Sequence, residues 1–90
     1  MEGFTNMSRI SEAKLRARFN AYKDMLDEAM GYTTAIKLYR ENSMYCWKVV
    51  VPSGDSGIHV IAEIGDTTRE AYIWVHGAMT HFFFTKYGVN

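Results

Sequence analysis

The side chains best suited to acid–base or metal chemistry are three histidines, His59, His76 and His81. Imidazoles exchange protons near neutral pH and bind divalent metals, so two of them held together would form an acid–base pair or part of a metal site. His76 and His81 flank a segment that we interpret as a hairpin turn, which predicts that they face each other across neighbouring strands. Glu63 lies far along its own strand and supplies no third ligand. We therefore predict no metal site, with His76 and His81 as its only weak candidates.

The other residues that could do nucleophilic or phosphate chemistry show weaker patterns. Cys46 is the only cysteine and has no predicted histidine neighbour, which is typical of a small half-buried side chain rather than of a nucleophile. The stretch Ser53-Gly54-Asp55-Ser56-Gly57 looks like a phosphate loop, but it lacks both the Gly-Lys-Ser/Thr ending and a following helix. We interpret it as a hairpin turn, and we predict no catalytic residue and no cofactor.

Composition limits the class of protein. The 90 residues are 48% hydrophobic, with one proline, which is typical of a single folded domain spanning 1–90. Ten Lys and Arg balance ten Asp and Glu, and this neutral charge argues against a nucleic-acid partner and favours self-association. A single cysteine excludes an internal disulfide, and no segment approaches the roughly 18 apolar residues of a membrane span. We expect a cytoplasmic protein that does not contact a membrane.

The first predicted element is an amphipathic helix over about residues 11–30. Ser11 is a suitable N-cap in front of the acidic Glu12, and Gly31 is a suitable residue to end the helix. Between them, apolar residues recur at steps of four and three, which is the period of one helix face. That face consists of Leu15, Phe19, Tyr22, Leu26 and Ala29.

After Gly31, β-branched and aromatic residues recur with period two, interrupted at regular intervals by turn residues. The predicted strands are about 32–39, 44–52, 57–64, 69–76 and 81–87. The connections between them suit hairpins and are too short for parallel crossovers. The predicted fold class is therefore α+β, an N-terminal amphipathic helix packed on one face of a four- to five-stranded antiparallel β-meander. Segment 32–39 has a second interpretation, because Thr34 is also a suitable cap for a short helix.

The hairpin register distributes side chains between two faces of this sheet, because residues that flank a short loop lie opposite each other and share a face. One face collects the aliphatic residues of every strand. We expect the helix to cover it and to contact Val49, Val60, Ile73 and Phe84. The outer face then carries an aromatic ridge that no remaining segment covers, and exposed apolar area of this kind is typical of an interface. The predicted partner-binding residues are Lys48, Val50, His59, Ile61, Tyr72, Trp74 and Phe83.

These features favour a small non-enzymatic protein–protein interaction module that uses the aromatic outer face. Its partner would be a larger protein, a second copy of the chain in a homodimer, or both. Small proteins with this profile are common among phage and mobile-element products, so an inhibitor of a host complex is one expectation.

Two alternatives remain open. A small ribonuclease or toxin-like enzyme would use His59, His76 and His81 as acids and bases, with Tyr72 and Arg69 beside them, although such toxins are usually strongly basic. A single-stranded RNA binder would instead stack bases on the aromatic residues of the outer face, where few cations are predicted.

Overall fold

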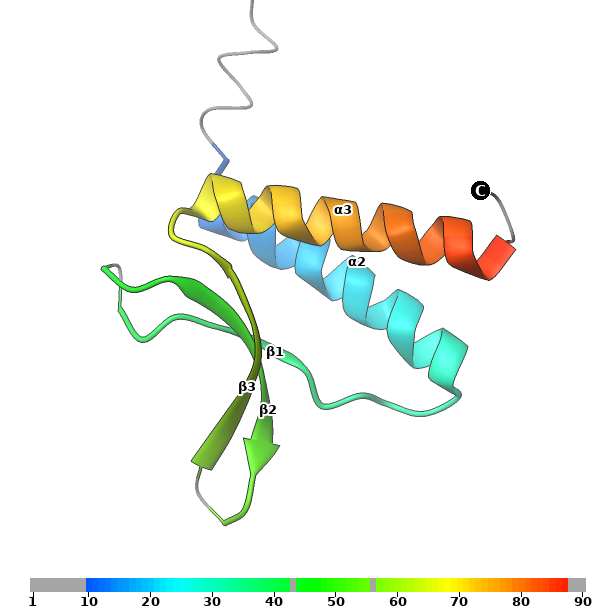
Figure 1. Cartoon of the computed structure of the whole chain (residues 1–90), viewed down its shortest axis with the longest axis horizontal. Coiled ribbons are helices and arrows are strands. Elements are labelled where there is room, and N and C mark those ends of the chain that lie inside the picture. Colours follow the sequence, from blue (N-terminus) through cyan, green and yellow to red (C-terminus); the bar gives the residue numbers. More distant parts are fainter. Residues whose placement is uncertain (1–9, 43, 56, 88–90) are drawn as a thin grey trace, which may run out of the picture.

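The computed structural model of the protein describes residues 10–42, 44–55 and 57–87. Along the chain it contains helix α2 (Glu12–Met30), strands β1 (Lys37–Tyr39), β2 (Trp47–Ser53) and β3 (Gly57–Gly65), and helix α3 (Thr68–Tyr87). The strands form an antiparallel sheet in the order β1-β2-β3. The two helices lie side by side, and the β2–β3 hairpin extends away from them (Figure 1). Ser56, which belongs to the predicted turn, lies outside the described residues.

Helix α2 confirms the helix predicted over 11–30. The hydroxyl of Ser11 accepts a hydrogen bond from the backbone N–H of Lys14 at 3.1 Å, so it satisfies one of the unpaired amides of the first turn. Gly31 ends the helix in a left-handed conformation with φ 78°, and its N–H donates to the carbonyl of Asp27. Both ends of α2 are therefore set by residues that the sequence identifies.

The connection after α2 is tied to the helix end by Asp27. Its carboxylate accepts hydrogen bonds from the backbone N–H of Thr34 at 2.8 Å, from the Thr34 hydroxyl at 2.6 Å and from the Lys23 ammonium at 2.8 Å. No helix follows Thr34, so it does not act as a helix cap. The predicted strand 32–39 is correspondingly shortened to Lys37–Tyr39, and both interpretations of that segment overstate its regular structure.

The predicted four- to five-stranded meander is wrong, because residues 68–87 form helix α3 rather than two strands over 69–76 and 81–87. The start of α3 is a reciprocal cap. The Thr67 hydroxyl accepts a hydrogen bond from the N–H of Glu70 at 3.0 Å, and the Glu70 carboxylate accepts from the N–H groups of Asp66 and Thr67 at 2.9 and 3.3 Å. Residues that we interpreted as a hairpin turn therefore begin a helix.

The buried side chains of α3 follow a helical period. Ala71, Tyr72 and Val75 are buried and Met79 packs against the core, so the inward face recurs every three to four residues. The many aromatic and β-branched residues of this segment favour a strand by intrinsic propensity, but such preferences are weak and packing overrides them. The predicted turn at 77–80 is consequently a stretch of helix, with Gly77 in its middle.

One apolar core joins both helices to the sheet. The buried cluster consists of Ile10, Leu15, Phe19, Ile36, Trp47, Val49, Ile64, Ala71, Tyr72 and Val75. The expected role of Leu15, Phe19 and Val49 is confirmed, whereas Val60, Ile73 and Phe84 are exposed instead of lying under a helix. Neither helix of the described chain has the length and apolar character needed to cross a membrane.

The register of β2 and β3 also differs from the prediction. Ser53, rather than Pro52, lies opposite Gly57, and the offset grows along the hairpin because Ile61 and Ile64 each stand opposite no residue of β2. Each such extra residue is a β-bulge that shifts the alternation of the following side chains. As a result of this difference in register, the part of β3 next to the turn, which includes Ile58 and Val60, faces the side of the sheet opposite to the one predicted.

Candidate functional site

The outer part of the β2–β3 hairpin is exposed on both faces. We define the distal hairpin as residues 51–53 of β2 and 57–61 of β3. Within it, Ile58, Val60 and Ile61 keep 49%, 40% and 51% of their surface accessible, whereas Ala62 and Ile64 further along β3 pack into the core. A strand that exposes apolar residues on both faces is unusual in a stable fold, because solvent contact with these side chains is unfavourable.

The pairs between β2 and β3 show which side chains share a face. Val49 and Val51 of β2 pack in or against the core, so Val50 and Pro52 point to the opposite, outer face. Val60 lies opposite Val50 and Ile58 lies opposite Pro52, and opposed residues share a face. The outer face of the distal hairpin is therefore aliphatic.

The backbone of β3 presents hydrogen-bonding groups at an open sheet edge. Pro52 has no N–H, so its pair with Ile58 is of the type without hydrogen bonds, and the two types alternate along an antiparallel ladder. The backbone groups of His59 then point towards β2, and those of Ile58 and Val60 point away from it. No strand of the described chain pairs with that edge, because β3 is the last strand of the sheet.

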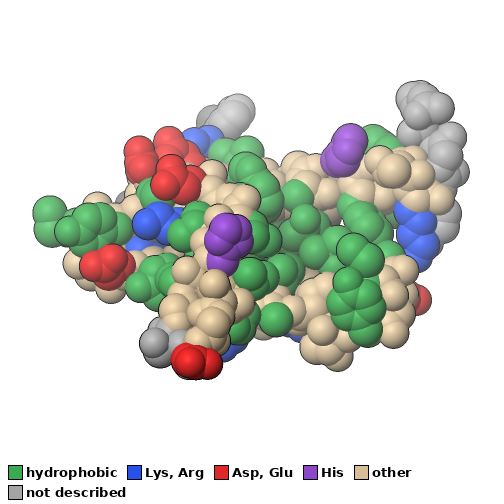
Figure 2. Space-filling view, turned by 60° about the horizontal axis from the view of Figure 1, so that its bottom comes forward, with side chains coloured by type: hydrophobic (Ala, Val, Ile, Leu, Met, Phe, Trp, Pro, Cys, Tyr) green, Lys and Arg blue, Asp and Glu red, His purple; other side chains and the backbone are tan. Residues whose placement is uncertain are grey.

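The two free edges of the distal hairpin are protected unequally. Natural sheets guard their edges with prolines and charged residues. The free edge of β2 carries Pro52, but β3 has neither a proline nor a charged residue from Gly57 to Ala62. On the face towards which the hairpin extends, hydrophobic side chains occupy the centre and charged ones lie mainly towards the periphery (Figure 2). The β3 edge is therefore an apolar surface that can accept another strand.

The structure divides the predicted partner-binding residues between the sheet and α3. Lys48, Val50, His59 and Ile61 belong to the sheet. Val50 is buried on the outer face between Lys37 and Val60, while His59 lies opposite Val51 on the helix side. Only part of the predicted set thus belongs to the distal hairpin.

The aromatic residues of the predicted ridge lie on α3 instead. Tyr72 is buried, and its hydroxyl accepts a hydrogen bond from Arg18 of α2 at 3.0 Å. Trp74 contacts the ring of Tyr22 edge-on at 6.4 Å between centroids, and burial raises the pKa of that tyrosine. Phe83 contacts the neighbouring ring of Phe84. Tyr72 and Trp74 contact side chains of α2, and Phe83 contacts its neighbour on α3. The three residues therefore do not form a sheet face.

The three histidines are not brought together as the hairpin prediction required. His59 is on β3, while His76 and His81 are on α3. Five residues along a helix correspond to a rotation of about 140°, so the last two point in different directions. Within the described part of the chain, no three His, Cys, Asp or Glu side chains are grouped so that they could hold a metal ion. Cys46 is half-buried, as expected for a structural residue.

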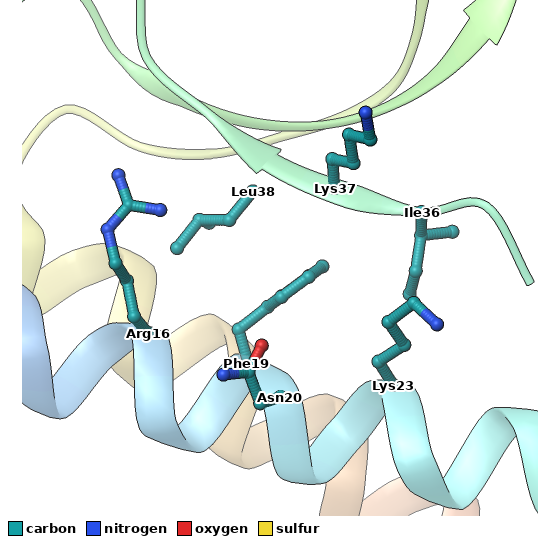
Figure 3. Close-up of a pocket in the computed structure, with 7 residues that line it drawn as sticks. All are labelled: Arg16, Phe19, Asn20, Lys23, Ile36, Lys37 and Leu38. Atoms are coloured by element: carbon teal, nitrogen blue, oxygen red, sulfur yellow. The ribbon is translucent and has the colours of Figure 1, made fainter.

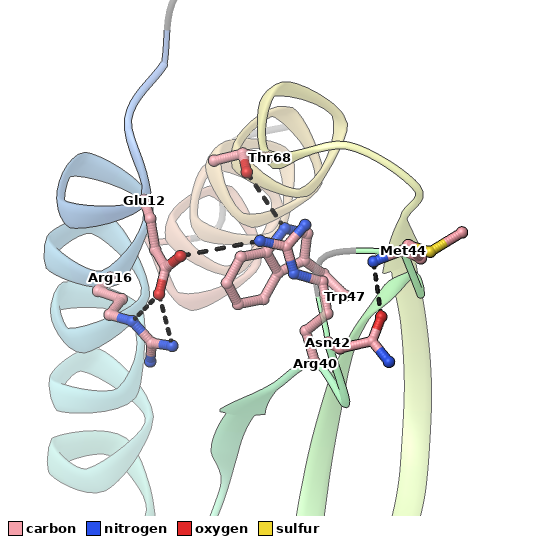
Figure 4. A network of polar contacts seen from close by, with 7 residues as sticks. All are labelled: Glu12, Arg16, Arg40, Asn42, Met44, Trp47 and Thr68. Carbon is pink, nitrogen blue, oxygen red and sulfur yellow. Dashed lines mark hydrogen bonds and ion pairs between the residues drawn. The ribbon is translucent and has the colours of Figure 1, made fainter.

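A network of polar contacts surrounds Trp47, and its groups contact one another. We call Glu12, Arg16, Arg40, Trp47 and Thr68 the Trp47 junction (Figure 4). The indole N–H donates to the Thr68 hydroxyl at 3.3 Å, and the two guanidinium groups lie 4.2 and 5.5 Å from the ring centroid. Glu12 pairs with both arginines. All of these groups serve to join α2, the sheet and α3.

A hollow of about 320 Å³ lies between α2 and β1, lined by Arg16, Phe19, Asn20, Lys23, Ile36, Lys37 and Leu38. It does not form an anion site. Arg16 and Lys23 are already paired with Glu12 and Asp27, and the Lys37 side chain points away from the helix (Figure 3). The hollow therefore offers no uncompensated charge to a ligand.

Sequence reasoning missed Ile58 and Val60, which it assigned to the helix-covered face. Pro52 is a signal that could have corrected the register at the hairpin end, because a proline restricts which pairs carry hydrogen bonds. The bulge at Ile61 has no comparable signal in the sequence.

Comparison of the chain with protein-family models, with curated proteins and with solved structures finds no match.

Proposed function

We propose that this protein is a small non-enzymatic protein-interaction module that binds an extended segment along the open edge of β3. The observation that carries the proposal is the apolar, uncharged distal half of β3, exposed on both faces at the end of the sheet. Strand addition is a common mode of peptide recognition, in which backbone hydrogen bonds supply affinity and alternate side chains supply specificity.

The chemistry of the edge specifies the partner segment. The backbone groups of Ile58 and Val60 bond a strand of any sequence, while their side chains favour β-branched or aromatic neighbours on the outer face. Without a charge between Gly57 and Ala62, the edge has no partner for a charged side chain opposite it. The expected ligand is an extended, apolar and uncharged segment of a protein.

The placement of polar groups supports a binding role over catalysis. The histidines that an enzyme would use lie on different elements and point in different directions, and the Trp47 junction is occupied by its own contacts. Tyr72, needed by both alternatives, is buried against Arg18. The proposed setting for such a module is inhibition of a host complex by a phage or mobile-element protein, and this setting assigns no further residue to the site.

The proposal is tested by selecting random linear peptides on the wild-type protein at low concentration and measuring their affinity for variants. Ile58→Lys and Val60→Lys place a charge on the outer face of the edge, and we expect each to weaken binding by at least about tenfold. Ile73→Lys is the matched control, because Ile73 is 47% exposed on α3, and it should leave affinity unchanged.

Selected peptides should also be rich in β-branched residues. If no peptide is obtained, or if the peptides bind Ile58→Lys and Val60→Lys as tightly as the wild type, the edge is not a binding site.

A further inference from the structure

The open edge of β3 has the backbone geometry to pair with the same edge of a second copy of the chain. We infer that two copies of this chain associate by antiparallel pairing of their β3 edges, with a two-fold axis at His59. The inference rests on the proposed function and names the segment that the edge accepts.

The register follows from the backbone groups that point outwards. A two-fold axis at His59 places Ile58 of each copy opposite Val60 of the other, and these are the two residues whose N–H and C=O groups point to the open edge. Each such pair exchanges two hydrogen bonds. All outward backbone groups of both residues are then satisfied in both copies.

Other registers satisfy fewer groups. An axis at Ile58 pairs that residue with its own copy and leaves Val60 facing the turn. An axis at Val60 requires Ile58 to pair with Ala62, which lies beyond the bulge at Ile61. A bulge shifts the alternation of inward and outward groups, so this pairing is mismatched. The bulge therefore limits the pairing to residues 57–61.

The side chains are complementary in this register. On the outer face, the Ile58 and Val60 side chains of the two copies lie next to each other, flanked by Pro52 of each copy. This joins two small aliphatic surfaces into one, which removes apolar area from water. The neutral net charge of the chain adds no long-range repulsion between copies.

On the helix side, the two His59 side chains meet across the axis. Residues in a pair without hydrogen bonds have Cα atoms about 4.5 Å apart, so their side chains interact strongly. Like charges in such a pair are unfavourable and opposite charges are favourable. No other two-fold register puts this residue opposite itself.

Five residues per copy form a small interface compared with the roughly 20–30 residues a side of a standard one. We therefore expect a dimer that forms at high protein concentration and dissociates on dilution. Sedimentation velocity of the full chain, at about pH 8 and over a range of concentrations up to the millimolar level, measures this equilibrium.

The decisive variants are His59→Lys and His59→Glu. Each alone should weaken self-association by about three- to fivefold, since it places like charges across the axis, and an equal mixture should associate more tightly than either variant. Ile58→Lys should abolish the dimer, whereas Ile73→Lys should not. Far-UV circular dichroism confirms that each variant is folded.

A wild type that stays monomeric at millimolar concentration overturns the inference, and so does a mixture that associates no better than its components. If selected peptides still bind at the edge, the proposed function survives this result. If a dimer forms but is disrupted by Ile73→Lys and not by Ile58→Lys, the interface lies on α3 and the inference is wrong.

Discussion

The two ends of the β2–β3 hairpin share strands but differ in what surrounds them. At the end nearest the helices, Trp47 is 1% exposed, lies under two arginines and donates a hydrogen bond to α3. At the other end, Ile58 and Ile61 are about half exposed, and the edge of β3 is unpaired within the described chain. One end is held by contacts with every other element, and the other end is held mainly by its own ladder.

Because of this difference, we expect residues at one end of the hairpin to determine the stability of the fold and residues at the other end to determine binding. Free energy of folding comes mainly from buried apolar area, which is concentrated at the Trp47 junction and the core next to it. Substitutions there should lower the free energy of unfolding, while substitutions in the distal hairpin should change association and leave folding nearly unchanged.

The largest loss of stability is expected for Trp47→Ala. Removing a fully buried indole leaves a cavity and the Thr68 hydroxyl without its donor, so the free energy of unfolding should fall by about 3–5 kcal/mol. Urea denaturation followed by far-UV circular dichroism measures the change, with the partly exposed Trp74→Ala as the matched control. Equal losses in the two variants would show that the junction has no special role.

A smaller loss is expected for Gly65→Ala, at the point where β3 approaches α3. An added Cβ would lie 2.6 Å from the Cβ of Glu70 and 2.7 Å from the amide nitrogen of Ala71, so backbone would have to move. Overpacking of this kind costs about 1–3 kcal/mol in the same denaturation experiment. Wild-type stability for this variant would mean that the backbone of α3 at Glu70 and Ala71 moves to accommodate the added Cβ at little cost.

Asp27→Asn removes the carboxylate that holds Thr34 at the C-terminal end of α2, and its effect on the free energy of unfolding should depend on pH. Hydrogen bonds from Lys23 and Thr34 lower the pKa of Asp27 from 3.8 to about 2. Since the folded state favours the carboxylate, its stabilisation is complete above about pH 4 and is lost as the pH falls towards 2.

The free energy of unfolding of the wild type should therefore be larger than that of the variant at neutral pH. The difference between them should become smaller between about pH 4 and pH 2. Urea titrations at several pH values in this range measure it. If the difference in free energy of unfolding between the two proteins is constant with pH, the ionised carboxylate of Asp27 does not stabilise the fold.

Gly77→Ala is expected to raise stability. Gly77 lies inside α3 and no atom would lie within 4 Å of an added Cβ, so alanine should add about 0.5–1 kcal/mol through its better helix propensity. In a hairpin turn the same change would give no such gain. Thermal denaturation monitored at 222 nm therefore also separates the helix from the meander.

The smallest effect on folding is expected for Ile58→Lys, at the distal end. Its side chain is already about half exposed and lies outside the core cluster, so the free energy of unfolding should stay within about 0.5 kcal/mol of the wild type. Together with loss of association, this result would complete the contrast with Trp47→Ala. A large loss of stability would mean that the distal hairpin also supports the fold.

Local signals were sufficient for some elements and insufficient for others. Ser11 and Gly31 delimit α2, and the turn at Gly54 and Asp55 joins β2 to β3, because caps and turns depend on residues close in sequence. The cap of α3 was also visible, as a Thr and a Glu three residues apart, but the strand-like composition that follows it favoured the wrong element.

Of the candidate site, His59 and Ile61 were among the predicted partner-binding residues, while Ile58 and Val60 were assigned to the helix-covered face although they lie opposite Pro52 and Val50. The reason is the register, which is offset by one residue at the turn and shifts again at the bulge at Ile61. Pro52 is a local signal for the first offset, whereas the bulge has none.

The sequence by itself determined α2 with its caps, the two strands of the hairpin and the neutral, apolar character of the chain, since these follow from neighbouring residues and composition. The tertiary structure alone decided that residues 68–87 are helical, because burying Ala71, Tyr72 and Val75 against α2 and the sheet outweighs their intrinsic preference for strands. It also decided which half of β3 is covered, because that depends on where the helices end and not on the residues of the strand.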